Sequence, residues 1–303
     1  MEQGLYALFS SLLTANMEYL SIRLLRERDT DFAHKMTVRE QWNVSKSDIK
    51  CMFNYEPNGC FIAEVKGLRA AHVFSVNYGN LGWIGLLIVK AEYRKKGIAT
   101  LLTQKAIDYL VHCGVETVKL EAVPEIADLY RKLGFLDEID SLRFMGKSRA
   151  TISLQSDSAT PIEKERIDEI AEFDAACFGA NRTRVLTSLC QENPNLCFAS
   201  YNGSEITGYI MCRKAEKGYN VGPFVCDPEE SQTARDLLAK CMQKLGSKTS
   251  IYLGVPAVNK STIEILQEFG FEQYSKSIRM RFGKNLGNER LSCIFAIGGA
   301  MKG

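Results

Sequence analysis

Several features are scarce or missing in this sequence, and each absence excludes a class of protein. Its three histidines lie far apart in the sequence and its ten cysteines include no C-x-x-C pair, so we expect no metal site. The scattered cysteines are instead expected to be free, mostly buried thiols. The 38 basic and 36 acidic residues leave a net charge of +2, which disfavours nucleic acid or anionic lipid as partners. No apolar run reaches the roughly 18 residues of a membrane span. The apolar stretch 5–13 follows Glu2 and Gln3 rather than the Lys or Arg of a secretory signal, so we expect a cytoplasmic protein.

The sequence does contain an alternation of strand and helix patterns that is typical of an α/β sheet. Its 303 residues suffice for two domains of roughly 150 residues each. Trp83 to Val89 is a nearly continuous apolar run, as expected of a strand that is covered on both faces. In the first half, strands are expected at 22–27, 60–65, 70–76, 83–89, 118–123 and 142–145, and helices at 31–53, 98–113 and 125–133.

The second half repeats this order of elements. Val89 and Val225 are 136 positions apart, and so are the Gly-Phe pairs at 134–135 and 270–271. Between them, Gly114 and Gly246 are 132 positions apart, as are the Val-Pro pairs at 123–124 and 255–256. We interpret these matches as two copies of one unit. The slip of four residues predicts that the long helix of the second copy has lost about one turn.

The repeat divides the chain into five parts. They are an N-terminal arm (1–20), a first domain (21–147), a Ser/Thr-rich linker (148–160), a second domain (161–284) and an apolar, glycine-rich tail (285–303). In the second domain, strands are expected at 196–201, 206–212, 219–225 and 251–255, and helices at 230–245 and 262–269.

The segment between the apolar strand 83–89 and the following helix is the one that indicates chemistry. Arg94-Lys95-Lys96-Gly97 is a tight basic turn, and the free N–H groups at the start of a helix form a natural phosphate site. Gly97 allows the main chain to approach an anion closely. An ordinary capped helix with a solvated basic patch fits the same pattern, so the residues alone leave both interpretations open.

This segment resembles the acetyl-coenzyme A pyrophosphate loop of the GNAT N-acetyltransferase superfamily. Arg94, Gly97 and Ala99 match its R-x-x-G-x-A motif, and A-D-L-Y-R-K-L-G-F at 127–135 resembles the second signature of that superfamily. The resemblance covers residues 20–147 well and 160–284 weakly, so the whole chain is similar to a tandem GNAT protein with a degenerate second domain. It implies a mixed α/β GNAT fold in two copies, acetyl-coenzyme A as co-substrate, no metal, and an amine acceptor.

The resemblance also implies roles for individual residues. The main chain near Leu87 and Val89 would bind the pantetheine arm of acetyl-coenzyme A. Tyr130 stands where the family often has a tyrosine that protonates the departing thiolate, which a phenol with a pKa of about 10 can do. The alternative for Tyr130 is a core aromatic residue with its hydroxyl at the rim. The pyrophosphate would be bound beside the side chain of Arg94 by the amides of Lys95, Lys96, Gly97, Ile98 and Ala99.

Two positions depart from the family pattern. Val123, followed at once by Pro124, stands where the family usually has an asparagine seven residues before the tyrosine. The strand 83–89 carries no acid that could serve as a general base. We therefore take Glu121 as the candidate base, with a surface glutamate as the alternative.

The second copy differs at the positions that matter for the cofactor. At the offset of 136, Arg94, Gly97, Ala99 and Tyr130 correspond to Glu230, Thr233, Arg235 and Leu266. Acidic residues at 227, 229 and 230 would repel a pyrophosphate, although Asn259 matches the asparagine of the family. We expect one coenzyme A per chain, with the second domain shaping the acceptor site or stabilising the first domain.

These patterns favour an acetyl-coenzyme A-dependent N-acyltransferase in which an amine attacks the thioester directly in a ternary complex. The alternative is a non-catalytic coenzyme A-binding or regulatory module. A nucleic-acid-binding protein would rest on the basic turn 94–96 alone, and the low net charge disfavours it. The acceptor, whether a small amine, an amino acid or a protein amine, has no sequence signature. We expect the loops between the early helices and the domain interface to select it.

Overall fold

The computed structural model describes residues 19–149 and 159–303, so most of the arm expected at 1–20 and of the linker expected at 148–160 lies outside the described residues. The first half consists of β1 (Leu20–Leu24), α2 (Thr30–Arg39), α3 (Lys46–Tyr55), β2 (Phe61–Val65), β3 (Leu68–Asn77), β4 (Leu81–Val89), α4 (Ile98–His112), β5 (Thr117–Ala122), α5 (Ala127–Lys132) and β6 (Leu136–Lys147). The second half consists of β7 (Thr160–Pro161), α6 (Ile167–Phe178), α7 (Thr183–Glu192), β8 (Cys197–Asn202), β9 (Glu205–Lys214), β10 (Tyr219–Cys226), α8 (Ser231–Lys244), β11 (Ser250–Pro256), α9 (Lys260–Glu268), β12 (Glu272–Gly283) and β13 (Ile294–Ala296).

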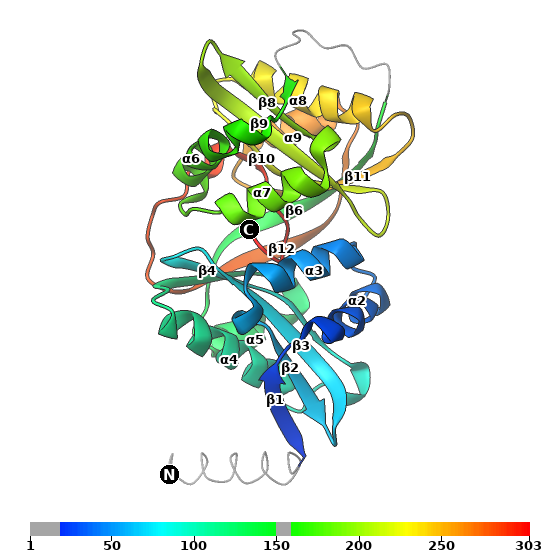
Figure 1. Ribbon diagram of the computed structural model, residues 1–303, viewed down its shortest axis with the longest axis vertical. Coiled ribbons are helices and arrows are strands. Elements are labelled where there is room, and N and C mark those ends of the chain that lie inside the picture. The colour runs from blue at the N-terminus through cyan, green and yellow to red at the C-terminus, as the bar shows by residue number, and fades with distance from the viewer. Residues whose placement is uncertain (1–18, 150–158) are drawn as a thin grey trace.

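The two halves contain the same succession of elements, which confirms the predicted mixed α/β fold in two tandem copies. In the first half β1 to β4 are antiparallel and β5 is parallel to β4. In the second half β7 to β10 are antiparallel and β11 is parallel to β10. The helix expected at 31–53 is divided into α2 and α3, and α3 meets α7 where the two halves face each other (Figure 1).

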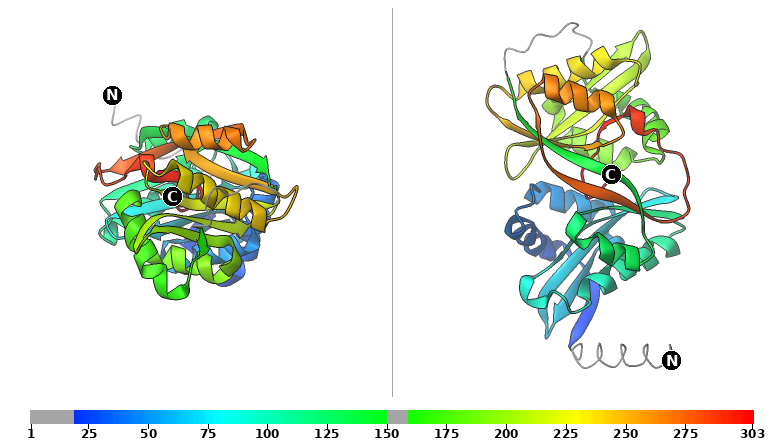
Figure 2. Two further views of the ribbon diagram at one scale, coloured as in Figure 1. Left: turned by 90° about the horizontal axis from the view of Figure 1, so that it is seen from above. Right: turned by 180° about the vertical axis from the view of Figure 1, so that it is seen from behind.

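The last long strand of each half pairs with strands of the other half. Strand β12 lies between β5 and β6, and β6 pairs with β11. A single sheet therefore passes through both halves in the order β1-β2-β3-β4-β5-β12-β6-β11-β10-β9-β8-β7. The right-hand view of Figure 2 shows the two long strands β6 (green) and β12 (dark orange) running between the halves. Main-chain hydrogen bonds join the halves, and they place Arg279 of β12 directly beside Glu121 of β5.

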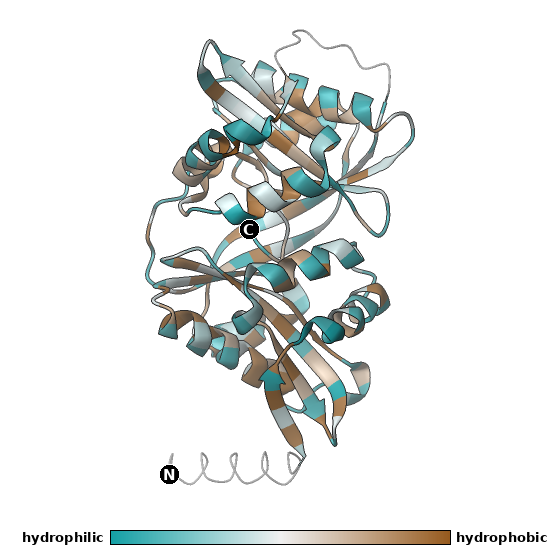
Figure 3. Ribbon diagram, in the orientation of Figure 1, coloured by the Kyte–Doolittle hydropathy of each residue, from teal (hydrophilic) through white to brown (hydrophobic). Residues whose placement is uncertain are grey.

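The predicted central strand β4 is buried on both faces. Trp83, Ile84, Leu86 and Ile88 are each at most 4% exposed, because α4 covers one face of the strand and the second half and tail lie over the other. Each apolar side chain buried in this way contributes roughly 1.5 to 3 kcal/mol to folding. Figure 3 shows the result, with apolar residues on the strands and on the inner faces of the helices.

The four-residue difference between the two copies lies in a loop and not in the long helix. Helices α4 and α8 have 15 and 14 residues, so the predicted loss of a helical turn is wrong. Residues 90–97 connect β4 to α4, whereas the shorter segment 227–230 connects β10 to α8. Gly97 and Glu230 directly precede the two helices, so Glu230, and not Thr233, is the equivalent of Gly97. The second copy therefore lacks half of the basic loop.

All ten cysteines are free thiols and eight of them are buried, as predicted. Within residues 19–149 and 159–303, no three His, Cys, Asp or Glu side chains come together as they would around a metal ion. Over the same ranges, no helix combines the length and the apolarity that crossing a bilayer requires.

Candidate active site

Strands β4 and β5 separate along their length. They pair in parallel only over Leu81–Trp83 and Thr117–Lys119. Just beyond this point the register between β4 and β3 shifts at a bulge, where Leu86 has a φ of 52°. The bulge takes Leu86 and Leu87 out of the ladder with β3, and the departure of β5 leaves the other edge of β4 open. The main chain at Leu87 can therefore pair with a ligand that lies between the two strands, where the sequence predicts the pantetheine arm.

Helix α4 begins without a side-chain cap. Gly97 precedes its first residue with a φ of 79°, and among residues 19–149 and 159–303 no side chain caps the first turn, so the capped helix of the alternative interpretation is not found there. Arg94 donates from Nε to the carbonyl oxygen of Val89 at 2.9 Å and forms an ion pair with Glu40, which fastens the loop to the end of β4. The two lysines that follow Arg94 are exposed. Free amides, the positive end of the helix dipole and two lysines together form a site for an anion.

A cavity of 430 Å³ opens where β4 and β5 diverge. It lies between the two halves, and three of the predicted site residues, Leu87, Glu121 and Tyr130, line it. The predicted residues Val89 and 94–99 do not line the cavity and lie further along, at the end of β4 and the start of α4. The second half contributes residues of β9, β10, β11 and β12, and the tail contributes Ile297 and 299–301.

Tyr130 of α5 is 5% exposed and packs edge-on against Phe135, with their ring centres 5.9 Å apart. Burial raises the pKa of Tyr130 above its ordinary value, so the phenol stays protonated at neutral pH. Its ring belongs to the core, as the alternative interpretation of Tyr130 expected, and the residue also lines the cavity. A protonated phenol at this wall can hydrogen-bond to a thiolate formed in the cavity and give it a proton, although the raised pKa makes this transfer less favourable than from an ordinary phenol.

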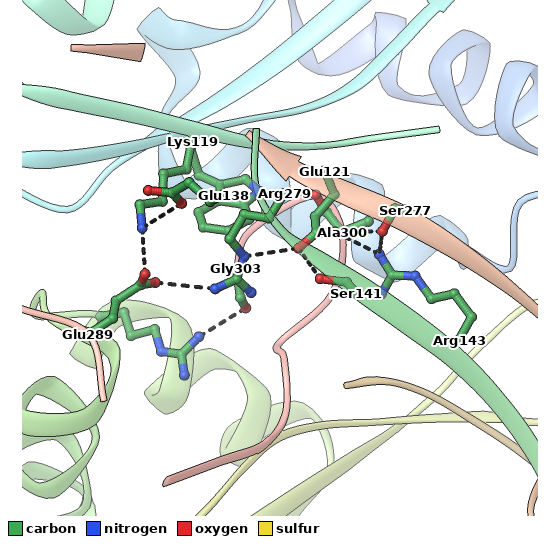
Figure 4. Close-up of polar contacts among 12 residues, drawn as sticks. Lys119, Glu121, Glu138, Ser141, Arg143, Ser277, Arg279, Glu289, Ala300 and Gly303 are labelled. Atoms are coloured by element: carbon green, nitrogen blue, oxygen red, sulfur yellow. Dashed lines mark hydrogen bonds and ion pairs between the residues drawn. The ribbon is translucent and has the colours of Figure 1, made fainter. Parts of the chain in front are cut away.

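Glu121 carries a fully buried carboxylate at the wall of the cavity, so the alternative of a surface glutamate is wrong. Its Oε1 accepts hydrogen bonds from Ser141 at 2.8 Å and Arg279 at 3.1 Å, and its Oε2 accepts them from Ser277 at 2.5 Å and Arg143 at 3.4 Å (Figure 4). Burial alone would raise the pKa of Glu121, but the charges of Arg279 and Arg143 and the two hydroxyl groups outweigh it and lower the pKa. Glu121 thus has the properties of an ionised counter-ion and not of a base that readily takes up a proton.

The ion pairs continue from Glu121 away from the cavity. Arg279 also donates to Glu289 at 3.3 Å, and Lys119 pairs with both Glu289 and Glu138 (Figure 4). Charges of opposite sign alternate along this chain, so each buried charge has a partner. The cluster fastens the first part of the tail, which contains Glu289, to β5 and β12.

The tail carries site residues that the sequence analysis missed. Trp83 donates from Nε1 to the carbonyl oxygen of Ala300 at 3.0 Å, and Tyr78 donates to that of Lys302 at 2.8 Å. Gly85 of β4 makes room for this contact, because a Cβ there would lie 2.5 Å from the Cα of Met301. The glycine-rich composition of the tail was the one available signal, since nothing local indicates which strand it covers.

The corresponding space in the second half is filled by the chain itself. Strands β10 and β11 pair in parallel only over Tyr219–Asn220 and Ile251–Tyr252, and β13 lies where they separate. Strand β13 pairs antiparallel with β10, and Ile297, directly after it, donates its N–H to Gly254 of β11 at 2.9 Å. Asn259 donates from Nδ2 to two carbonyl oxygens of the tail, both at 3.0 Å, so the residue that matches the family's asparagine holds β13 in place.

Two family models match this chain. The one described as "Acetyltransferase (GNAT) family" matches residues 22–135, and the one described as "Acetyltransferase (GNAT) domain" matches residues 170–296. The holothin acyltransferase of a Pseudoalteromonas species is 26% identical over 259 residues, which cover 85% of this chain and 86% of that protein. The uncharacterized N-acetyltransferase YitH of Bacillus subtilis is 22% identical over 199 residues, which cover 65% and 68% of the two chains.

Solved structures show the same fold. A putative acetyltransferase from Pyrococcus horikoshii has a TM-score of 0.80 at 23% identity, covering 94% of this chain and 96% of its own. A tandem GNAT protein from the clavulanic acid biosynthesis pathway has a TM-score of 0.60 at 12% identity, covering 87% of this chain and 98% of its own. The arrangement of two such units in one chain is therefore shared with other proteins.

Proposed function

Because this chain is a tandem protein of the GNAT acyltransferase superfamily, we propose that it transfers an acetyl group from acetyl-coenzyme A to an amine and that its first half alone binds the coenzyme. One observation carries the proposal. The gap between β4 and β5 opens into a cavity beside an uncapped helix, whereas the equivalent gap between β10 and β11 is occupied by β13. The second domain is degenerate in this proposal, both in its shortened loop and in its filled gap.

The first half offers the main-chain groups and helix amides that binding of coenzyme A requires. The main chain of Leu87 and Val89 would pair with the amides of the pantetheine arm, and the first-turn amides from Lys95 to Ala99 would bind the pyrophosphate. Arg94 would remain the residue that holds this loop against Val89, as its hydrogen bond at 2.9 Å supports.

The transfer itself is a direct attack. The amine nitrogen forms a bond to the thioester carbon, the bond from that carbon to sulfur breaks, and the thiolate takes a proton from the hydroxyl of Tyr130. Glu121 has no exposed surface on its carboxylate and four hydrogen-bond donors around it, so we assign it the positioning of Arg143 and Arg279. The amine then gives its proton to water in the cavity, and solvent returns one to the phenolate of Tyr130.

The buried state of Glu121 also favours the second candidate, a coenzyme A-binding module without activity, because it leaves no side chain in the role of the base. The release of free thiol over a panel of amines separates the two functions. An enzyme releases coenzyme A in proportion to the acceptor, and a binding module releases none.

We expect calorimetric titration with acetyl-coenzyme A to give one binding site per chain. The physical reason is that β13 already makes the main-chain hydrogen bonds that a second pantetheine arm would need. A stoichiometry of two would refute the division of roles between the halves, and the absence of any binding would refute the proposed function.

Replacing Tyr130 with phenylalanine should lower kcat by about 100-fold, the lower end of the usual contribution of a general acid, because a thiolate is already a fair leaving group. The affinity for acetyl-coenzyme A should not change, since only a hydroxyl group is lost. Steady-state kinetics and calorimetry check both expectations. Tyr109→Phe is the matched control, because Tyr109 loses the same group and does not line the cavity. An unchanged kcat in Tyr130→Phe would mean that the thiolate leaves without this proton.

A further inference from the structure

The cavity is electropositive where it extends from the gap between β4 and β5 into the second half. Four cationic side chains line it, and within residues 19–149 and 159–303 Glu121 is the only carboxylate that does. The cations are Arg143, Arg213, Lys217 and Lys276. The charge of Glu121 is itself compensated by Arg279, so the lining carries an excess of positive charge.

Two of the four cations have carboxylate partners outside the cavity. Arg213 donates to Asp48 at 2.7 Å and to the carbonyl oxygen of Gly222 at 2.9 Å. Lys276 pairs with Asp140 at 2.7 Å. Protein carboxylates therefore already neutralise the charges of these two side chains. Arg143 and Lys217 are the two cations that can bind a ligand.

Arg143 is held in place with part of its donor capacity unused. In the described part of the chain, its side chain hydrogen-bonds only through Nη2, to Ser277 at 2.7 Å and to Glu121 at 3.4 Å. Nε and Nη1 have no hydrogen-bond partner among residues 19–149 and 159–303, and the side chain is 15% exposed. Gly254 of β11 leaves room for the guanidinium, because a Cβ at this position would lie 1.9 Å from Nη1. A fixed guanidinium with free N–H groups in a cavity is a typical site for a carboxylate.

We propose that the acceptor is a small amine that also carries a carboxylate, in other words an amino acid, and that Arg143 binds this carboxylate. The inference rests on the proposed function and names the substrate class of the same site. Lys217, which is exposed at the hairpin between β9 and β10, adds attraction at the wall. The hairpin is tied to the loop between α2 and α3 by Asn43, whose Oδ1 accepts from the N–H of Lys217 at 2.7 Å. A volume of 430 Å³ suits a small molecule better than a protein surface.

The test compares each of the twenty L-amino acids with its α-carboxamide as acceptor for acetyl-coenzyme A, with thiol release as the readout. The two forms differ in the carboxylate alone. We expect kcat/KM for the preferred free amino acid to exceed that for its amide by about 10- to 100-fold, as one charge-assisted hydrogen bond warrants. Arg143→Gln should reduce this ratio to about one, mainly through KM. Lys147→Gln, an exposed lysine on the same strand that does not line the cavity, should leave the ratio unchanged.

A second variant keeps the charges and moves the guanidinium. Gly254→Ala places a Cβ where Nη1 of Arg143 lies, so it should also lower the ratio although it removes no charge, and Glu121 keeps its ion pair with Arg279. Melting temperatures of both variants report whether they fold.

The outcomes separate this inference from the function on which it rests. If the wild type does not bind acetyl-coenzyme A in calorimetry, the proposed function fails. If it binds, but amides react as well as acids, or neither form reacts, the carboxylate assignment alone is overturned. A preference for succinyl-coenzyme A over acetyl-coenzyme A that Arg143→Gln removes would place the carboxylate on the acyl donor and would also overturn it.

Discussion

Replacing Gly97 with aspartate should weaken the binding of acetyl-coenzyme A by more than about 100-fold while the helix remains intact. The first turn of α4 has no side-chain cap among the described residues, and an aspartate at this position would place a negative charge beside the amides that we assign to the pyrophosphate. The new carboxylate would repel the phosphates from these amides, and the loss of two charge-assisted hydrogen bonds would cost roughly 1.5 to 3 kcal/mol each. Aspartate tolerates the left-handed conformation of Gly97, with its φ of 79°, better than most residues do.

Titration calorimetry of Gly97→Asp against Gly67→Asp checks this expectation. Gly67 lies in the hairpin between β2 and β3 with a φ of 73°, and no atom of the described residues lies within 4 Å of its potential side chain. The control therefore introduces the same charge in the same backbone conformation at an open position. Wild-type affinity in Gly97→Asp would show that the phosphates bind elsewhere, and a loss in Gly67→Asp would attribute the effect to net charge.

The order of elements was predictable because each copy carries its own local signals. The apolar run of β4 indicates a buried strand without any knowledge of the rest of the chain, and glycines mark the ends of several helices. The position of the four-residue difference was not predictable in the same way. The anchors on either side, Val89 and Gly114, limit it to the segment between them, and both a shorter loop and a shorter helix satisfy that limit.

The parts of the site that are continuous in sequence were predictable, and the parts that depend on strand exchange were not. The loop 94–99 and Tyr130 belong to motifs that a single stretch of sequence reveals. Arg143 reaches the cavity because β6 pairs with β11 and β12, more than 100 residues away. The same pairing surrounds Glu121 with arginines, which changes a candidate base into a buried counter-ion. Long-range pairing of this kind leaves no periodic pattern in the sequence.

We propose that the second copy does not bind coenzyme A, and the tail supplies a second reason for this besides the acidic residues in its sequence. Acidic residues before α8 suggested that a pyrophosphate would be repelled there, and Glu230 does stand at the start of that helix. Strand β13 adds a steric reason, since it fills the gap beside β10. The residues that follow β13 then cross to β4 and line the cavity. One segment thus closes the second gap and completes the wall of the first.

Replacing Lys302 with methionine should stabilise the chain by about 4 kcal/mol at pH 7, which is a large effect for one side chain. Lys302 is 0% exposed, and its Nζ makes no hydrogen bond among the described residues. Burial, and next the charge of Arg213, lower the pKa of Lys302 from 10.5 to about 7 against the opposing effects of Asp48, Cys51 and Glu192. Methionine fills a similar volume without a charge to desolvate. Asp48 loses its 3.8 Å ion pair with Lys302 and keeps the shorter one with Arg213 at 2.7 Å.

The pH dependence of this gain follows from the direction of the shift. Between pH 7 and pH 10.5 the unfolded chain holds a proton on Lys302 that the folded chain has released, so the free energy of unfolding of the wild type rises with pH. The advantage of Lys302→Met should therefore fall from about 4 kcal/mol at pH 7 to about 2 kcal/mol at pH 9. Guanidinium unfolding of both proteins at pH 7, 8 and 9 measures the difference. Lys147→Met, at an exposed position on β6, should show no such trend. A difference that stays constant with pH would mean that Lys302 remains charged inside the protein.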